Sequence, residues 1–260
     1  MKFFKTKRIF DGTLQKVPLD LIKKLNLHYL KYTNLTHYAG KHDLPALYCN
    51  TDVFPDYIAL YSQKCDYHRT PNTAVAFYQF DDSFDGQNGL YSAIYYNNKK
   101  QLDGFKERFK GVRFFISPDY SELGDIDDIE NIYRIKKSRV VAIWLMIELN
   151  AVVIPHITFP TISTIEFYLD GLEDCTVVAF STKGYVSNKF EREILIEAVK
   201  YTVNRLNLKA IVVYDVCQDN KNAEEIFKYA IEKGIRVIIP PNIIKLRNQV
   251  NKARRKNNAS

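Results

Sequence analysis

Short runs of apolar, β-favouring residues recur along most of this chain, and their regular spacing restricts its fold more than any other feature. The runs cover Thr73–Phe80, Val112–Ile116, Ala151–Ile154, Cys175–Phe180, Ala210–Tyr214 and Ile235–Ile239. From residue 112 onward they begin about 31 residues apart on average, which is the length of one β–α unit. Because the runs are apolar on both faces, they are typical of central strands in a parallel sheet.

Helical patterns lie between these runs, over residues 126–149, 188–206 and 222–233. Asn188 with Glu191 resembles a capping box, as does Asn222 with Glu225, and Gly234 supplies a left-handed helix stop. Alternating strands and helices predict an α/β fold with a mainly parallel sheet. The sheet is expected to be either doubly wound or barrel-like, as an incomplete TIM-type arrangement. A closed barrel needs two more strands, for which residues 91–96 and a segment before residue 70 are candidates.

The expected organisation has three parts. Residues 1–70 form an irregular N-terminal segment that packs on the main domain and contains one amphipathic helix at Pro18–Leu30. Residues 71–242 form the βα-repeat domain. Residues 243–260 form a basic C-terminal tail.

Positive charge is concentrated at the two ends of the chain. The formal net charge is +7, from 37 basic and 30 acidic residues. Residues 1–8 and 241–260 hold ten of the bases and no acid, so 27 bases remain against 30 acids and the body is about −3. The tail bases are Lys245, Arg247, Lys252, Arg254, Arg255 and Lys256. They predict nucleic-acid binding through phosphate contacts, and the alternative is a solvated end that aids solubility.

The sequence also predicts where the protein works. No run reaches about 18 consecutive apolar residues, so no membrane span is expected. The start, MKFFKTKRIFDG, lacks the apolar core and the small-residue cleavage site of a secretory leader. The four cysteines, Cys49, Cys65, Cys175 and Cys217, are scattered and fit reduced thiols. We therefore expect a cytoplasmic protein.

Polar residues follow most of the predicted strands at the point where each strand ends. They are Asp81, Asp82, Asp119, His156, Lys183 and Asp215. Because ligands of parallel α/β folds bind at the carboxyl ends of strands, these six residues are the candidate catalytic set. Asp81, Asp119 and Asp215 are the candidate oxygen ligands of a divalent cation, the one cofactor that the sequence raises.

Each candidate also has a structural interpretation. Asp119 in the sequence SPDYS fits a turn or helix cap, and Asp81 and Asp82 fit a solvated loop. His156 fits a hydrogen-bonded core histidine, and Lys183 an exposed side chain before a glycine. Only their occurrence together at strand ends raises the hypothesis of a site.

Other signals are weaker. Four of the five histidines, together with Cys49 and Cys65, fall within residues 28–68, but their spacing lacks the two close pairs of a zinc signature. No Walker-type phosphate loop, no dinucleotide-binding glycine motif and no G-x-S-x-G elbow is present.

Several short motifs, taken in order, resemble an uncharacterised domain-of-unknown-function family of Gram-positive bacteria, their phages and other mobile genetic elements. The motifs are FDDSF at 80–84, GV at 111–112 followed by SPDYS at 117–121, Arg139 five residues before Trp144, VIP at 153–155, and DG at 170–171 ahead of VVAFS at 177–181. Phe159 stands where the family is expected to have tryptophan. The resemblance implies a mobile-element context and no established activity.

Two hypotheses follow. The first is a metal-dependent enzyme, such as a hydrolase, that acts on a nucleotide or nucleic acid through the strand-end acids, with His156 and Lys183 stabilising negative charge. The alternative is a non-catalytic module that binds nucleic acid or protein in replication, transfer or host interaction of the element.

Overall fold

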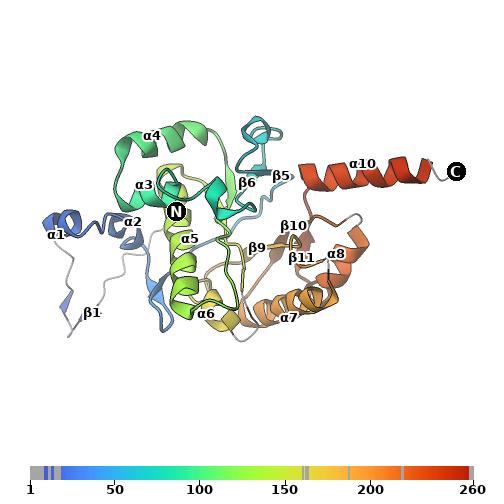
Figure 1. The fold of residues 1–260 in the computed structure, drawn as a ribbon. Coiled ribbons are helices and arrows are strands. Elements are labelled where there is room, and N and C mark those ends of the chain that lie inside the picture. Colours follow the sequence, from blue (N-terminus) through green and yellow to red (C-terminus); the bar gives the residue numbers. More distant parts are fainter. Residues whose placement is uncertain are drawn as a thin grey trace.

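Two parallel sheets form the centre of the molecule (Figure 1). The computed structural model describes residues 9–10, 13–14, 19–159, 161, 164–186, 188–217 and 220–257. The first sheet contains, in this order, β5 (Tyr57–Leu60), β6 (Thr73–Ala76), β7 (Phe114–Ile116) and β8 (Val152–Ile154). The second contains β9 (Val177–Ser181), β10 (Ala210–Tyr214) and β11 (Arg236–Ile238), with β10 in the middle. Two short antiparallel pairs join β1 (Ile9–Phe10) to β2 (Thr13–Leu14) and β3 (Tyr38–Ala39) to β4 (Leu44–Pro45).

Single β-bridges link the edges of the two sheets. His156, just beyond β8, bridges Ala179 of β9, and the flanking bonds run from Ala179 N to the Pro155 oxygen (2.7 Å) and from Ile157 N to the Ala179 oxygen (2.9 Å). At the other edge, Ile58 of β5 bridges Asn242. The predicted α/β class with parallel sheets is confirmed. Within the described residues, however, the strands remain two sheets and do not form a closed barrel.

Helices connect and cover the strands. They are α1 (Leu19–Lys24), α2 (Leu30–Thr33), α3 (Leu90–Tyr95), α4 (Lys99–Arg108), α5 (Asp128–Glu148), α6 (Ile165–Leu169), α7 (Lys189–Arg205), α8 (Asn220–Ile226), α9 (Lys228–Glu232) and α10 (Ile243–Asn257), with 3-10 turns η1 (Lys64–Asp66) and η2 (Asp81–Ser83). None of the helices in the described part of the chain has the length and apolar character that crossing a bilayer requires.

Side-chain caps set several helix starts. The Asn188 side chain accepts a hydrogen bond from Glu191 N (3.0 Å), as the sequence predicted, and Asp127 accepts one from Glu130 N (2.9 Å) at the start of α5. Gly234 has φ of 78°, the left-handed conformation that its position after α9 predicted.

Four element predictions need correction. Residues 91–96 lie mainly in α3 and are not a strand, because Leu90, Tyr91, Ala93 and Ile94 are buried with helical spacing. The segment 18–30 divides into α1 and the start of α2, and residues 222–233 divide between α8 and α9. The tail beginning at residue 243 is largely the helix α10.

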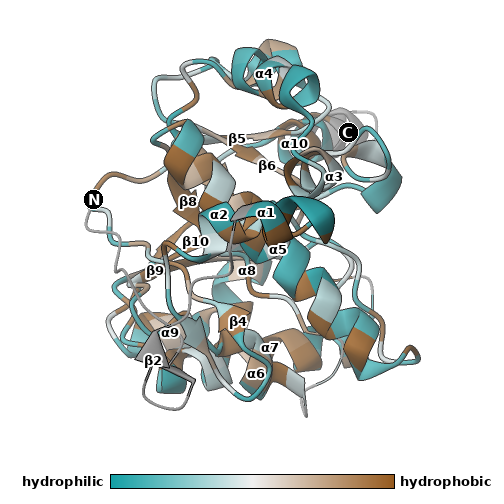
Figure 2. Cartoon of the chain, turned by 90° about the vertical axis from the view of Figure 1, so that its left-hand side faces the viewer, coloured by the Kyte–Doolittle hydropathy of each residue, from teal (hydrophilic) through white to brown (hydrophobic). Residues whose placement is uncertain are grey.

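One apolar core includes side chains from both sheets and from the helices that cover them. In Figure 2 the strands are mostly brown, whereas the covering helices carry both brown and teal residues. Because the strands of each sheet are parallel and the bridges between the sheets are parallel too, their carboxyl ends gather on one side. We call this side, where β6 to β10 end, the carboxyl rim.

Candidate functional site

Three side chains from three strand ends contact one another in a chain at the carboxyl rim. The Tyr78 hydroxyl lies 3.0 Å from Nδ1 of His156, and Nε2 of His156 lies 3.3 Å from Oδ1 of Asp119. The two contacts are satisfied together when Nε2 carries a proton that it donates to Asp119 and Nδ1 accepts the proton of Tyr78. This arrangement fixes the ring and places its Nε2 against the Asp119 carboxylate.

Tyr78, His156 and Asp119 differ in how far they are exposed to solvent. Tyr78 is 2% exposed and the His156 side chain 5%, whereas the Asp119 side chain is 30% exposed. The His156 backbone N donates to Oγ of Ser117 (2.8 Å), which ties the end of β8 to the end of β7. Asp119 is therefore the member of the chain that a solvent-borne substrate can reach.

Glu122 places a second carboxyl group near Asp119. Its Oε2 is buried and has no hydrogen-bond partner among the described residues. Burial raises the pKa of Glu122 well above its usual value, and the charge of Asp119 raises it further, while Thr158 and Tyr168 oppose this only in part. Burial thus favours the protonated form of Glu122, which lies near a second carboxyl group that contacts a histidine.

Lys183 and Tyr185 come from the loop after β9. Nζ of Lys183 donates to the Tyr78 carbonyl oxygen (2.8 Å), so the predicted lysine does join this group. Tyr185 stacks on Phe159 with 5.7 Å between ring centroids. Burial raises the pKa of Tyr185, and the charges of Asp119 and Glu122 add to that effect. The ring at position 159 therefore helps to hold a wall of the site.

Asp215 instead belongs to a buried network at the end of β10. Its Oδ1 accepts from the Thr182 hydroxyl (2.9 Å) and Cys217 N (3.0 Å), and its Oδ2 lies 2.5 Å from Nζ of Lys245. Asp215 is fully buried, and Lys245 is 4% exposed. None of the other predicted site acids is among the partners of Asp215.

Asp81 and Asp82 lie in η2, which residues 77–80 separate from the end of β6. Oδ1 of Asp81 accepts from Ser121 N (3.0 Å) and the Ser121 hydroxyl (2.9 Å), and Oδ2 lies 2.8 Å from the Arg134 guanidinium. Asp81 therefore ties together loops of the rim. The Asp82 carboxylate accepts from the hydroxyl of its neighbour Ser83 (3.4 Å).

The structure does not assemble the predicted metal set. In the part of the chain that is described, no three or more His, Cys, Asp or Glu side chains are grouped so that they could hold a metal ion. This covers Asp81, Asp119 and Asp215, and also the histidines and cysteines of residues 28–68.

The predicted nucleic-acid-binding residues lie in α10. Lys245 is buried in the ion pair with Asp215 and is not available to a phosphate, whereas Arg247 is exposed. The backbone of Lys252, Arg254, Arg255 and Lys256 is helical, and their side chains lie outside the described residues. The basic residues at 1–8 also lie outside them.

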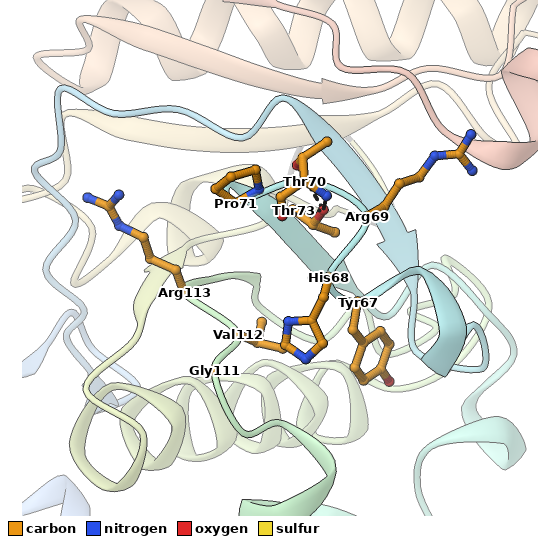
Figure 3. A pocket seen from close by; sticks show the side chains of 9 residues that line it. All are labelled: Tyr67, His68, Arg69, Thr70, Pro71, Thr73, Gly111, Val112 and Arg113. Carbon is orange, nitrogen blue, oxygen red and sulfur yellow. Dashed lines mark hydrogen bonds between the residues drawn. The ribbon is translucent and has the colours of Figure 1, made fainter.

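A cavity of about 260 Å³ lies at the opposite side, near the amino ends of β6 and β7 (Figure 3). Its lining includes Arg69, Thr70, Thr73 and Arg113. These side chains already have partners, because Arg69 contacts the Tyr57 hydroxyl, Arg113 contacts Asn72, and the two threonines bond to each other. We therefore place the candidate site at the carboxyl rim.

Sequence reasoning missed Tyr78, Glu122 and Tyr185. Tyr78 lies inside the predicted strand Thr73–Phe80, Glu122 follows Asp119 by three positions, and Tyr185 follows Lys183 by two.

A protein-family model described as a domain of unknown function (DUF4417) matches residues 36–244. No curated protein and no solved structure matches the chain.

Proposed function

The chain belongs to the DUF4417 family of domains of unknown function, and we propose that it is a hydrolase that acts by acid–base chemistry at the carboxyl rim. The observation that supports this most strongly is the Tyr78–His156–Asp119 chain of contacts, with the Glu122 carboxyl group, whose pKa is raised by burial, near Asp119. Two neighbouring carboxyl groups in different surroundings, one buried and one open to solvent, are a usual basis for assigning an acid and a base.

The proposed roles follow from these environments. Asp119 takes a proton from water as the water attacks the substrate, and His156 stabilises and orients that carboxylate. Glu122, whose pKa is raised by burial, gives its proton to the leaving group. Lys183 contributes positive charge where negative charge develops.

We propose a nucleotide or nucleic acid as the substrate class. Lys183 supplies positive charge at the rim, and the sequence of α10, a helix that starts directly after Asn242, contains five further bases besides the buried Lys245. A cytoplasmic location and service to a mobile genetic element complete the proposal, and they rest on the sequence resemblance and the scattered cysteines.

The test is an activity screen with nucleoside phosphates and with single- and double-stranded oligonucleotides, run with and without Mg²⁺, Mn²⁺ or Zn²⁺. Asp119→Asn and Glu122→Gln are each expected to lower kcat/KM by about 100-fold or more, because each removes one proton-transfer group. Asp174→Asn, an exposed aspartate before β9, is the matched control and is expected to have no effect. Wild-type rates in both site variants contradict the proposed site, and no turnover across the panel contradicts the substrate class.

A second candidate function is a non-catalytic nucleic-acid-binding module. It is favoured by one observation, a helix of 15 residues that contains six bases and no acid. In that case Asp119 and Glu122 have no effect on function, and α10 carries the binding.

A further inference from the structure

The most exposed apolar side chains of the described chain lie on segments that follow strand ends. Phe80 is 81% exposed, Ile129 80% and Phe190 70%. Phe80 follows β6, Ile129 lies in the first turn of α5 after β7, and Phe190 lies in the first turn of α7 after β9. The carboxyl rim is therefore also where apolar surface is left uncovered, and such surface commonly marks a binding site.

Phe80 lies next to the candidate site along the chain. Two residues before it, Tyr78 contacts His156, and one residue after it, Asp81 is fixed by Ser121 and Arg134. The backbone on both sides is thus anchored while the ring itself faces solvent. Nζ of Lys183 lies 6.0 Å from the centroid of the Phe80 ring, so a positive charge stands beside the exposed ring.

An exposed aromatic ring beside a lysine matches the chemistry of an unpaired nucleotide. Every nucleobase has a flat π-face that stacks on an aromatic side chain, and each phosphate pairs with a nearby lysine or arginine. A duplex hides its base faces and cannot use the ring in this way. An acidic protein partner would use the charge, but it has no need of a flat ring held next to that charge.

We propose that Phe80 is a stacking platform for an unpaired nucleobase, with Lys183 beside it to pair with the adjoining phosphate. This inference rests on the proposed function and narrows its substrate to single-stranded nucleic acid. Phe190 on α7 provides a second apolar surface at the same rim.

A tryptophan substitution turns the platform into a reporter. Trp144 is the only tryptophan of the sequence and is fully buried. In Phe80→Trp a second, exposed indole is added, and a ligand that stacks on it changes the fluorescence of that indole. A dT15 oligonucleotide is expected to quench this emission, and a 15-base-pair duplex is expected not to.

Affinity for labelled dT15 is then measured by fluorescence anisotropy. Phe80→Ala and Phe80→Leu are both expected to weaken binding about tenfold, because leucine keeps the apolar character but not the flat ring. Phe80→Trp is expected to bind at least as tightly as wild type. Tyr48→Ala is the matched control, since Tyr48 is 45% exposed and adjoins Cys49, which bridges Cys175 ahead of β9, at the opposite side.

The proposal is overturned if wild type does not bind dT15, if Phe80→Leu binds like wild type, or if duplex quenches the indole as strongly as dT15. The assay needs no turnover, so it is independent of the acid–base proposal. The stacking platform alone is wrong if Phe80→Ala binds dT15 normally while Asp119→Asn loses activity. In that case Asp119→Asn should still bind dT15 normally. If Phe80→Ala loses binding and Asp119→Asn stays active, the proposed acid–base site alone is wrong.

Discussion

At the residue scale, burying Glu122 beside Asp119 makes the stability of the fold depend on pH. The pKa of Glu122 is raised in the folded chain, with burial as the largest cause. Above the unfolded value of about 4.3, the unfolded chain loses this proton while the folded chain keeps it. The folded state then binds more protons, so its stability falls as pH rises, by at most about 1.4 kcal/mol per pH unit for one group.

Glu122→Gln removes this titration and tests the assignment. We expect the stability of the variant relative to wild type to increase steadily from pH 4.5 to 7.5, measured by urea denaturation at each pH. Glu224→Gln, at an exposed position in α8, is the control and should follow the wild-type pH dependence. Parallel curves for wild type and Glu122→Gln contradict a neutral buried carboxyl group at this position.

The sequence located the strand ends, but it could not show what each acid touches. Asp119 and Asp215 gave the same signal, a lone acid after a buried strand. In the structure Asp119 meets His156, whereas Asp215 is paired with Lys245, which lies 30 residues further along the chain. Partners at such separations follow from tertiary packing, so the sequence could place both acids at strand ends but could not distinguish Asp119 from the buried, ion-paired Asp215.

At the element scale, the apolar periodicity predicted the buried strands. It gave the wrong element where residues that favour strands cover the core as a helix. The β-type residues of 91–96 are aromatic and branched, yet α3 forms there because its apolar face covers the core. The tail was read by its charge alone. Its first turn instead inserts Lys245 into the core, and Asn248 donates to the Val216 oxygen (3.0 Å), which fixes the start of α10.

This anchoring decides how the tail has to be tested. Deletion of residues 249–260 keeps Lys245 and Asn248 and removes four bases of α10. We expect the folded state to persist, the affinity for dT15 to fall, and the slope of log K against log salt to decrease by up to about 3, measured by anisotropy at several salt concentrations. An unchanged affinity and slope contradict a role for α10 in binding.

A deletion that begins at residue 243 is the instructive contrast. It also removes Lys245 and leaves the carboxylate of Asp215 buried without its cation, which costs about 3–5 kcal/mol. Loss of binding in that variant reports on folding and not on the tail bases.

At the scale of the whole molecule, the candidate site lies at the junction of the two sheets. His156 supplies the imidazole of the site, and its backbone forms the bridge to Ala179 of β9. The geometry of the Tyr78–His156–Asp119 chain therefore requires β8 and β9 to remain side by side. The common apolar core, which includes residues of both sheets, provides the free energy that keeps them together.

If the junction is part of one cooperative unit, the amides that form it exchange only when the molecule unfolds globally. Native-state hydrogen exchange is expected to give Ala179 and Ile157 opening free energies within about 1 kcal/mol of those of Val153 in β8 and Val212 in β10. Gln101, whose amide is bonded only by the exposed Asn98 cap, is the control and is expected to exchange much faster. If Ala179 and Ile157 open well below the strand amides, the sheets separate locally. A site built across them then cannot hold His156 against Asp119 in the resting protein.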